Sequence, residues 1–100
     1  MVYRVVFATR AIHDLGDIVR FQAKLNATHA ERLGYALFDD AMSLATLPRR
    51  GVSVPERPGY RRIFHPRWFL IFYQVNETAQ TVTIVRIWDA RNDPKLLWRE

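Results

Sequence analysis

The chain has 100 residues, 49% of them apolar, and a net charge of +5, which fits one globular domain and excludes an intrinsically disordered protein. It contains no cysteine, which excludes disulfide bonds and thiolate metal sites and is typical of a reducing compartment. The longest apolar run, Trp68 to Tyr73, is far short of the roughly 20 residues that a membrane helix needs. The N-terminal apolar stretch is interrupted by Arg4 and is too short and too charged for a signal peptide. We therefore expect one domain over residues 1–100, in the cytoplasm and without a membrane partner.

The first half of the chain predicts a strand followed by two helices. Residues 2–7 are rich in β-forming side chains and predict a strand with Tyr3, Val5 and Phe7 on one face and Arg4 on the other. Thr9 offers an N-cap for a first helix, which has apolar residues at helical spacing and ends at Asn26. Residues 28–31 have the Thr-x-x-Glu pattern of a capping box and open a second helix, which Leu47-Pro48 ends. Because only a few residues separate the two helices, we expect an antiparallel helical hairpin.

The second half predicts a loop and three strands. The loop covers residues 48–59, which contain three prolines and two glycines. Strands are expected over residues 60–64, 67–75 and 81–88, and the second of these is the most apolar, which is typical of a central strand. The resulting order is β-α-α-β-β-β. It predicts an α+β fold in which the helical hairpin packs on one face of a small antiparallel-rich sheet, with the first strand added by a long crossover.

The net charge of the chain is confined to the window from Arg49 to Arg67. This window holds six arginines against a single acid, Glu56, whereas nine basic and nine acidic side chains cancel in the remainder. The chain has thirteen arginines and two lysines, and a guanidinium grips phosphate or carboxylate with two hydrogen bonds and stacks on rings. A GC-rich genome would also favour arginine, but it would not explain the clustering. The pattern predicts an anionic partner, which is nucleic acid, an acidic protein or both.

Arginines in the predicted strands are candidates for an anion site. Arg61 and Arg62 are neighbours in a strand, so one of them faces away from the helices. Arg86 lies inside an apolar strand, where a charge is costly unless it is solvated or paired. Two interpretations stay open: Arg86 converges with one of this pair on the open face of the sheet, or these are solvated charges or partners of Asp89, Asp93 or the tail. The full set of candidate anion- or target-binding residues is Arg49, Arg50, Arg61, Arg62, Arg67, Arg86 and Arg91.

A histidine and two tryptophans are further candidates. His65, in the predicted turn, is a possible general acid or base, although a His-Pro turn is more often only a turn. Trp88 shares a strand face with Arg86 and is either a stacking platform for a base or the floor for a partner's helix. Trp98 lies in a tail that either folds back onto the sheet or anchors to another chain. The three histidines are scattered without metal-ligand spacing, so no metal is expected.

Several short motifs occur along the chain in a fixed order. They are Ala11, Asp14 and Leu15 at the start of the first helix, Ala30 early in the second, Leu47-Pro48 followed by Gly51, the pair Arg61 and Arg62, the apolar run over 69–75, and Val-x-Ile-Val-Arg-Ile-Trp-Asp-Ala-Arg over 82–91. In this order and spacing the chain resembles the RelE/ParE superfamily of toxins from bacterial type II toxin–antitoxin modules. The resemblance covers nearly all of residues 1–100 and implies a single RelE/ParE-like toxin domain.

The resemblance implies one of two activities. RelE-like toxins cut messenger RNA in the ribosome without a metal, and their basic side chains orient the scissile phosphate. ParE-like toxins poison DNA gyrase and are not enzymes. Both are held inactive by a cognate antitoxin, which wraps a helix and often a strand around the toxin, and neither activity needs a cofactor. An acidic, partly disordered antitoxin would complement the basic window.

The C-terminal sequence resembles the ParE-like toxins more than the nucleases. Leu70 stands where many nuclease members have an arginine, no tyrosine follows Tyr73, and no histidine follows His65. We therefore expect a growth-inhibiting toxin of the plasmid-stabilising kind, which acts by binding and poisoning DNA gyrase, with Trp88 and Trp98 as the antitoxin-binding residues. The alternative is a ribosome-dependent, metal-independent mRNA endoribonuclease. Its catalytic groups would be Arg61, Arg62, Arg86 and His65. A third interpretation is a non-toxic member whose basic patch binds only its antitoxin.

Overall fold

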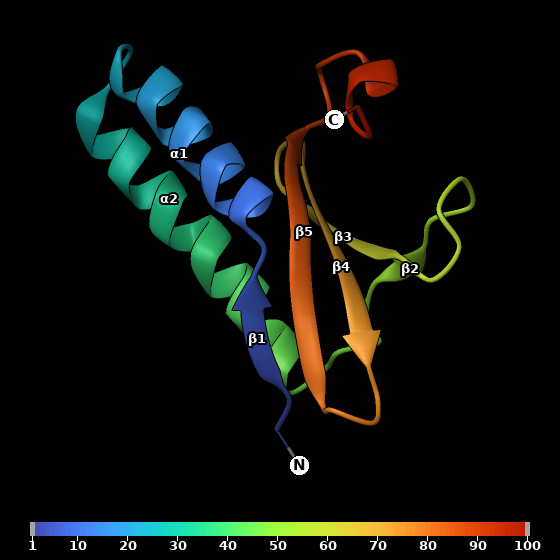
Figure 1. Cartoon of the computed structure of the whole chain (residues 1–100). Helices are drawn as coiled ribbons and strands as arrows, with labels where there is room; N and C mark the ends of the chain where they lie inside the picture. Colours follow the sequence, from blue (N-terminus) through green and yellow to red (C-terminus); the bar gives the residue numbers. More distant parts are fainter. Residues whose placement is uncertain (1, 100) are drawn as a thin grey trace.

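A five-stranded mixed sheet carries two helices on one face in the computed structural model, which describes residues 2–99 (Figure 1). The elements are β1 (Arg4–Phe7), α1 (Thr9–Ala23), α2 (Ala27–Met42), β2 (Val52–Ser53), β3 (Arg61–His65), β4 (Phe69–Asn76) and β5 (Thr81–Asp89), with short 3₁₀ turns η1 (Ser43–Ala45) and η2 (Pro94–Leu96). The strand order is β1-β5-β4-β3-β2. β1 runs parallel to β5, and the other neighbours are antiparallel. The predicted α+β fold is confirmed, including β4 as the middle strand and the crossover that adds β1.

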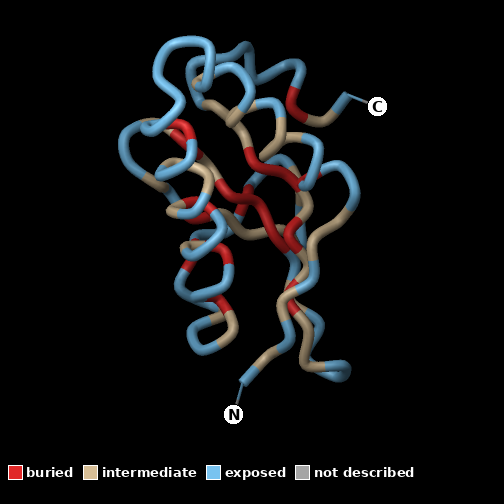
Figure 2. Tube along the Cα trace, turned by 90° about the vertical axis from the view of Figure 1, so that its left-hand side faces the viewer, coloured by how far each residue is buried: buried red, intermediate tan, exposed pale blue. Residues whose placement is uncertain are grey.

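The helical hairpin and the sheet enclose the main core. Leu37, Ala41 and Leu44 from α2 and η1 pack against alternate residues of β4 and β5, such as Ile71 and Ile84. Figure 2 shows the buried stretches running through the sheet and along the inner sides of the helices, while the outer sides are exposed. Within residues 2–99 no helix combines the length and apolar character needed to cross a membrane.

The sheet face opposite the helices is partly covered, although the sequence predicted an open face. Val54, Phe72 and Leu97 form a second buried cluster there, and Trp88 and Trp98 pack against it. The covering residues come from the loop before β3 and from the C-terminal tail, which folds back over the sheet. The consequence is that only part of this face is free to meet a partner.

Two local features differ from the sequence prediction. β2 was missed because its two residues lie in a segment rich in proline and glycine, and they form a strand only by pairing with Arg61 and Arg62 of β3. β5 carries an extra residue opposite the step from Phe72 to Tyr73, since these pair with Arg86 and Ile84. This bulge breaks the strict alternation of β5, because Val85, which has no partner on β4, and Arg86 both lie on the face opposite the helices.

The helix N-termini also use caps other than those predicted. Thr9 is the first helical residue of α1, and its N-cap, Ala8, makes no side-chain cap bond. The N-cap of α2 is Asn26, whose Oδ1 accepts a hydrogen bond from the backbone N–H of His29 at 2.9 Å. The predicted capping box at Thr28 is therefore wrong. Asparagine is at least as good an N-cap as threonine, and the chain turns into the helix at the earlier of the two.

Replacing Asn26, the observed N-cap of α2, should destabilise the protein, whereas replacing Thr28, the predicted cap, should not. We expect Asn26→Ala to lower the free energy of unfolding by about 1 kcal/mol, because the N–H of His29 loses its acceptor. The measurement is urea unfolding followed by circular dichroism. Thr28→Ala is the matched control and should change the stability little; a larger loss in Thr28→Ala than in Asn26→Ala would contradict the assignment.

Candidate functional site

Arg86 is buried, with 6% of its surface exposed, and its guanidinium is bound inside the domain. Its Nε and Nη2 donate to the two carboxylate oxygens of Asp14 at 2.7 and 3.1 Å, and its Nη1 donates to the backbone carbonyl of Leu97. Asp14 Oδ2 also accepts the backbone N–H of Ile87 at 3.0 Å. This Asp14–Arg86 pair therefore joins α1, β5 and the C-terminal tail.

The position of Asp14 follows from where β1 ends. β1 pairs with β5 only as far as Phe7 and Ile84, and the chain then enters α1. The next part of β5 has no strand on that side, so the N–H of Ile87 would lack a partner. Asp14 supplies the acceptor from α1, and its negative charge neutralises Arg86.

The structure therefore contradicts the expected solvent access of Arg86. The residue does lie on the face opposite the helices, but the tail covers it. Of the two interpretations that the sequence left open, pairing is the one observed. The tail contributes as expected, whereas the carboxylate is that of Asp14, from the first helix, and neither Asp89 nor Asp93 takes part.

The strand register places Arg62 on the face opposite the helices and Arg61 on the helix side. Arg62 pairs with Phe72 of β4, and Phe72 pairs with Arg86 of β5, so the two arginines lie in one row with an aromatic ring between them. Arg62 forms no ion pair with any residue from 2 to 99. Together with exposed Val52 and Phe64 it lines a shallow depression of about 350 Å³. Arg62 is thus an available cation at the free part of the sheet.

Arg61 instead supports the turn around Gly51. Its Nη1 donates to the carbonyl of Gly51 at 2.8 Å, and the N–H of Gly51 donates to the hydroxyl of Tyr73 at 3.0 Å. A Cβ on this glycine would lie 2.6 Å from both the carbonyl oxygen of Arg62 and the Tyr73 hydroxyl, so only glycine fits. Burial raises the pKa of Tyr73, while the bond from Gly51 and the charges of Arg61 and Arg50 lower it by smaller amounts.

Two arginines of the basic window are held by carboxylates. Arg49 pairs with Glu77, which also accepts from the hydroxyl of Tyr3. Arg50 pairs with Asp40 at 2.7 Å. These pairs compensate two charges of the basic window with acids from α2 and the β4–β5 turn, both of which lie outside the window in the sequence.

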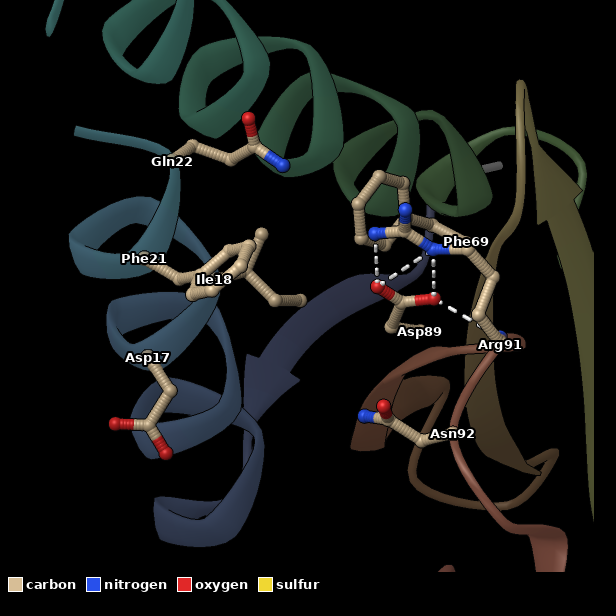
Figure 3. A pocket seen from close by; sticks show the side chains of 8 residues that line it. All are labelled: Asp17, Ile18, Phe21, Gln22, Phe69, Asp89, Arg91 and Asn92. Carbon is tan, nitrogen blue, oxygen red and sulfur yellow. Dashed lines mark hydrogen bonds and ion pairs between the residues drawn. The ribbon is translucent and has the colours of Figure 1, made fainter. Parts of the chain in front are cut away.

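Arg91 pairs with Asp89 at 2.6 Å at the end of β5. Figure 3 shows this pair beside Phe69, at the rim of a cavity of about 470 Å³ whose other wall is α1. Hydrogen bonds from Arg91 are the main reason that the pKa of Asp89 is lowered. Arg91 and Arg67 both lie near the ring of Trp68, with Cζ atoms 4.0 and 5.9 Å from its centroid. This group lies at the start of β4.

His65 lies on the helix side of β3, on the face away from Arg62. Its Nδ1 is 2.9 Å from Oδ2 of Asp40, and Oδ1 of Asp40 holds Arg50. The imidazole therefore joins β3 to α2 and is separated by the sheet from the row that contains Arg62 and Arg86. The residues proposed for an RNA-cleaving site are consequently not gathered around one point.

Trp88 and Trp98 are both half-buried within the domain. The guanidinium of Arg86 lies over Trp88, with Cζ 5.2 Å from the ring centroid. Trp98 packs edge-on against Phe72 and Tyr60, with centroids 5.0 and 5.4 Å apart. Of the two interpretations left open for Trp98, folding back onto the sheet is the one observed, and a contact of Trp98 with an antitoxin stays a prediction. Within residues 2–99 no cluster of three acidic or histidine side chains is placed to hold a metal ion.

Comparison with known proteins assigns the family. Residues 5–94 match the family described as "ParE toxin of type II toxin-antitoxin system, parDE". The chain belongs to this toxin family. A search of the curated proteins finds no match. The predicted membership of the RelE/ParE superfamily is thereby confirmed, and the chain is a toxin of a type II toxin–antitoxin system.

Solved structures share the fold of this ParE-family toxin. A chain of the chromosomal ParDE toxin–antitoxin system from P. aeruginosa has 22% identity and a TM-score of 0.74, over 86% of this chain and 94% of that one. A chain of the RelBE2 complex from Mycobacterium tuberculosis has 23% identity and a TM-score of 0.68, over 87% and 96%. The isolated E. coli RelE toxin has 19% identity and a TM-score of 0.57, over 93% and 89%.

Removing Asp14 should destabilise the toxin strongly. In Asp14→Ala the buried Arg86 loses its counter-charge and Ile87 loses its acceptor, so we expect the free energy of unfolding to fall by about 3 kcal/mol or more. Urea unfolding measures this loss. The matched control is Asp17→Ala, which breaks an exposed pair with Arg20 and should cost less than about 1 kcal/mol. Equal losses in the two variants would contradict a structural role for the Asp14–Arg86 pair.

The stability of the toxin should fall above pH 10 partly because of Tyr73. Its folded-state pKa is raised above the ordinary value of 10.0, so the unfolded chain releases this proton first as the pH rises. The contribution is therefore complete below pH 10.0 and is lost between that value and the folded-state pKa. Urea unfolding between pH 8 and pH 11, to either side of that value, measures the slope. Tyr73→Phe should be less stable at neutral pH but show a shallower alkaline slope, and an unchanged slope would refute this attribution.

Proposed function

We propose that this ParE-family toxin stops growth by binding and poisoning DNA gyrase, and that it acts as a binding protein without cleaving RNA. The main support is the state of Arg86, which is buried and neutralised by Asp14. A nuclease that works without a metal needs several available cations at the scissile phosphate and a proton-transfer group within hydrogen-bond reach. The sequence-predicted set does not meet this need, because His65 is held by Asp40 on the other side of the sheet from Arg62.

The proposed contact surface for gyrase is the free part of the sheet around Arg62. Arg62 has no ion-pair partner within residues 2–99, and its neighbours Phe64 and Val52 are 57% and 60% exposed. An arginine between exposed apolar side chains is typical of a protein interface, where arginine and aromatic residues contribute most of the binding energy. We place the contact with gyrase at this surface.

The proposed inhibitor is a cognate antitoxin, acidic and partly disordered. The similar structures include the ParDE system and RelBE toxin–antitoxin complexes. Arginines that form no ion pair within the described residues, such as Arg62, favour an acidic partner through charge complementarity. Trp88 and Trp98 remain the candidates for the contact, now as members of the second apolar cluster rather than as isolated anchors.

A second candidate function is ribosome-dependent cleavage of messenger RNA. It is favoured by the shared fold with RelBE2 and RelE and by the unpaired Arg62. In that case, Arg62 would position a phosphate and His65 would have to act as the base. The two functions make opposite predictions for His65.

Expression of the chain alone in bacteria distinguishes these functions. We expect pulse-labelling to show an early fall in DNA synthesis with translation intact, and purified toxin to inhibit gyrase supercoiling. Arg62→Gln should weaken that inhibition about tenfold without unfolding the protein, because a central interface arginine is lost. Arg32→Gln, which removes an exposed arginine of α2, is the matched control.

The same assay includes a variant for the nuclease alternative. His65→Gln keeps a hydrogen-bonding group beside Asp40 and should leave growth arrest intact. An early fall in protein synthesis, together with loss of toxicity in His65→Gln, would contradict the gyrase proposal and support RNA cleavage.

A further inference from the structure

A small pocket on the face opposite the helices gathers arginines from four separate parts of the chain. Its volume is about 190 Å³. The residues that matter here are Arg10 at the start of α1, Arg57 in the loop before β3, Arg86 in β5 and Arg99 in the tail, with Tyr60 and Trp98 in the walls. Three of these arginines, Arg10, Arg57 and Arg99, were not among the candidates that the sequence suggested.

The charge in this pocket is not compensated by any residue from 2 to 99. Arg86 is neutralised by Asp14, but Arg10, Arg57 and Arg99 form no ion pair in that part of the chain, and none of its acidic side chains lines the pocket. The N-cap of α1 makes no side-chain bond, so the positive end of this helix, beside Arg10, is also without an internal partner. Three like charges around so small a volume repel one another, and an anion would relieve that repulsion.

Arg57 is positioned before any ligand arrives. Its Cζ is 4.6 Å from the ring centroid of Trp98 and 5.3 Å from that of Tyr60. Its Nε is buried and has no hydrogen-bond partner within residues 2–99. A buried Nε–H without an acceptor is costly, and the contact of the guanidinium with two rings reduces the entropy that binding would otherwise cost. This combination is expected of a binding site and not of a solvated surface arginine.

The number of arginines favours phosphate over carboxylate. A carboxylate carries one charge, and a single guanidinium satisfies both of its oxygens. A free phosphate or phosphomonoester carries up to two charges and at least three acceptor oxygens, and a nucleic-acid strand brings one charge with each successive phosphodiester. Either matches guanidiniums that approach from separate segments. The volume of about 190 Å³ is below the roughly 300 Å³ at which pockets for drug-sized molecules begin, so the pocket suits the phosphate group alone.

We infer that this pocket binds a phosphate group. The group belongs either to the backbone of a nucleic-acid strand or to a small molecule, which is inorganic phosphate or a nucleotide. The pocket is distinct from the Arg62 surface proposed for gyrase, and this inference does not depend on that proposal.

Titration of the purified full chain tests the inference. The probes are inorganic phosphate, a single-stranded oligonucleotide of about eight nucleotides and a polyglutamate peptide, and the signals are calorimetric heat and tryptophan fluorescence, to which Trp98 contributes. We expect the phosphate-bearing probes to bind and the affinity to fall as salt is added. Arg57→Gln and Arg99→Gln should each weaken binding at least about tenfold, because each removes a charge-assisted hydrogen bond. Arg32→Gln on α2 should bind as the unaltered chain does.

The outcomes separate the sources of the phosphate. Tighter binding of the oligonucleotide than of inorganic phosphate, sensitive to both substitutions, assigns the pocket to a nucleic-acid backbone, and equal binding assigns it to free phosphate. Unchanged affinity in both variants, no binding of either phosphate probe, or tighter binding of polyglutamate would overturn the inference. Should Arg57→Gln fail to fold by circular dichroism, the exposed Arg99→Gln decides the result. The Arg99→Gln variant should inhibit gyrase as the unaltered chain does. The phosphate inference and the gyrase proposal can therefore fail independently of each other.

Discussion

The buried ion pair between Asp14 and Arg86 is the contact on which the arrangement of this toxin depends. It satisfies the N–H of Ile87 where β1 no longer covers β5, fixes α1 against that strand, and holds the carbonyl of Leu97 above the sheet. The tail then covers Phe72 and completes the second apolar cluster. A buried pair of this kind adds little net stability over apolar residues, but the loss of one partner leaves an uncompensated charge. Its role is therefore to specify where the helix and the tail lie, and both surfaces proposed for binding follow from that placement.

Internal pairing also decides which arginines are available to a partner. The sequence concentrates the net charge between residues 49 and 67, and the fold redistributes it. Arg49 and Arg50 are compensated by Glu77 and Asp40, and Arg61 binds the Gly51 carbonyl. The cations without an ion pair in residues 2–99 include Arg62 on the free sheet surface. They also include Arg10 and Arg99 of the small pocket, which both lie outside the window in the sequence. The arginines on which the two proposals depend therefore lie on the sheet face opposite the helices and come from segments far apart in sequence.

The sequence was sufficient for the fold because its signals were local and periodic. Apolar residues repeated at helical spacing in residues 9–42 and in runs over β4 and β5, and the order of these elements restricted the topology. The site was less predictable because its contacts are long-range. Asp14 and Arg86 are 72 residues apart, and Asp14 has the appearance of an ordinary acid near a helix start. β2 and the bulge at Val85 have no periodic signal, since each depends on the partner strand. The sequence offered one clue to this ion pair, which is the position of Arg86 inside an apolar strand. That position indicated a paired charge as strongly as it indicated a ligand site.

Ion pairs inside the domain decide which arginines are available to a partner. The most direct test of this is the exchange rate of the arginine Nε–H protons with water, measured by nuclear magnetic resonance on the full chain. The Nε–H of Arg86 is buried and bonded to Asp14, so its proton should exchange with water far more slowly than that of Arg62, which has no ion pair in residues 2–99. The difference should persist when salt is added, because a buried pair is screened little. Exchange of the Arg86 proton as fast as that of Arg62 would show that the tail does not cover it, and would return Arg86 to the surface as a ligand for an anion.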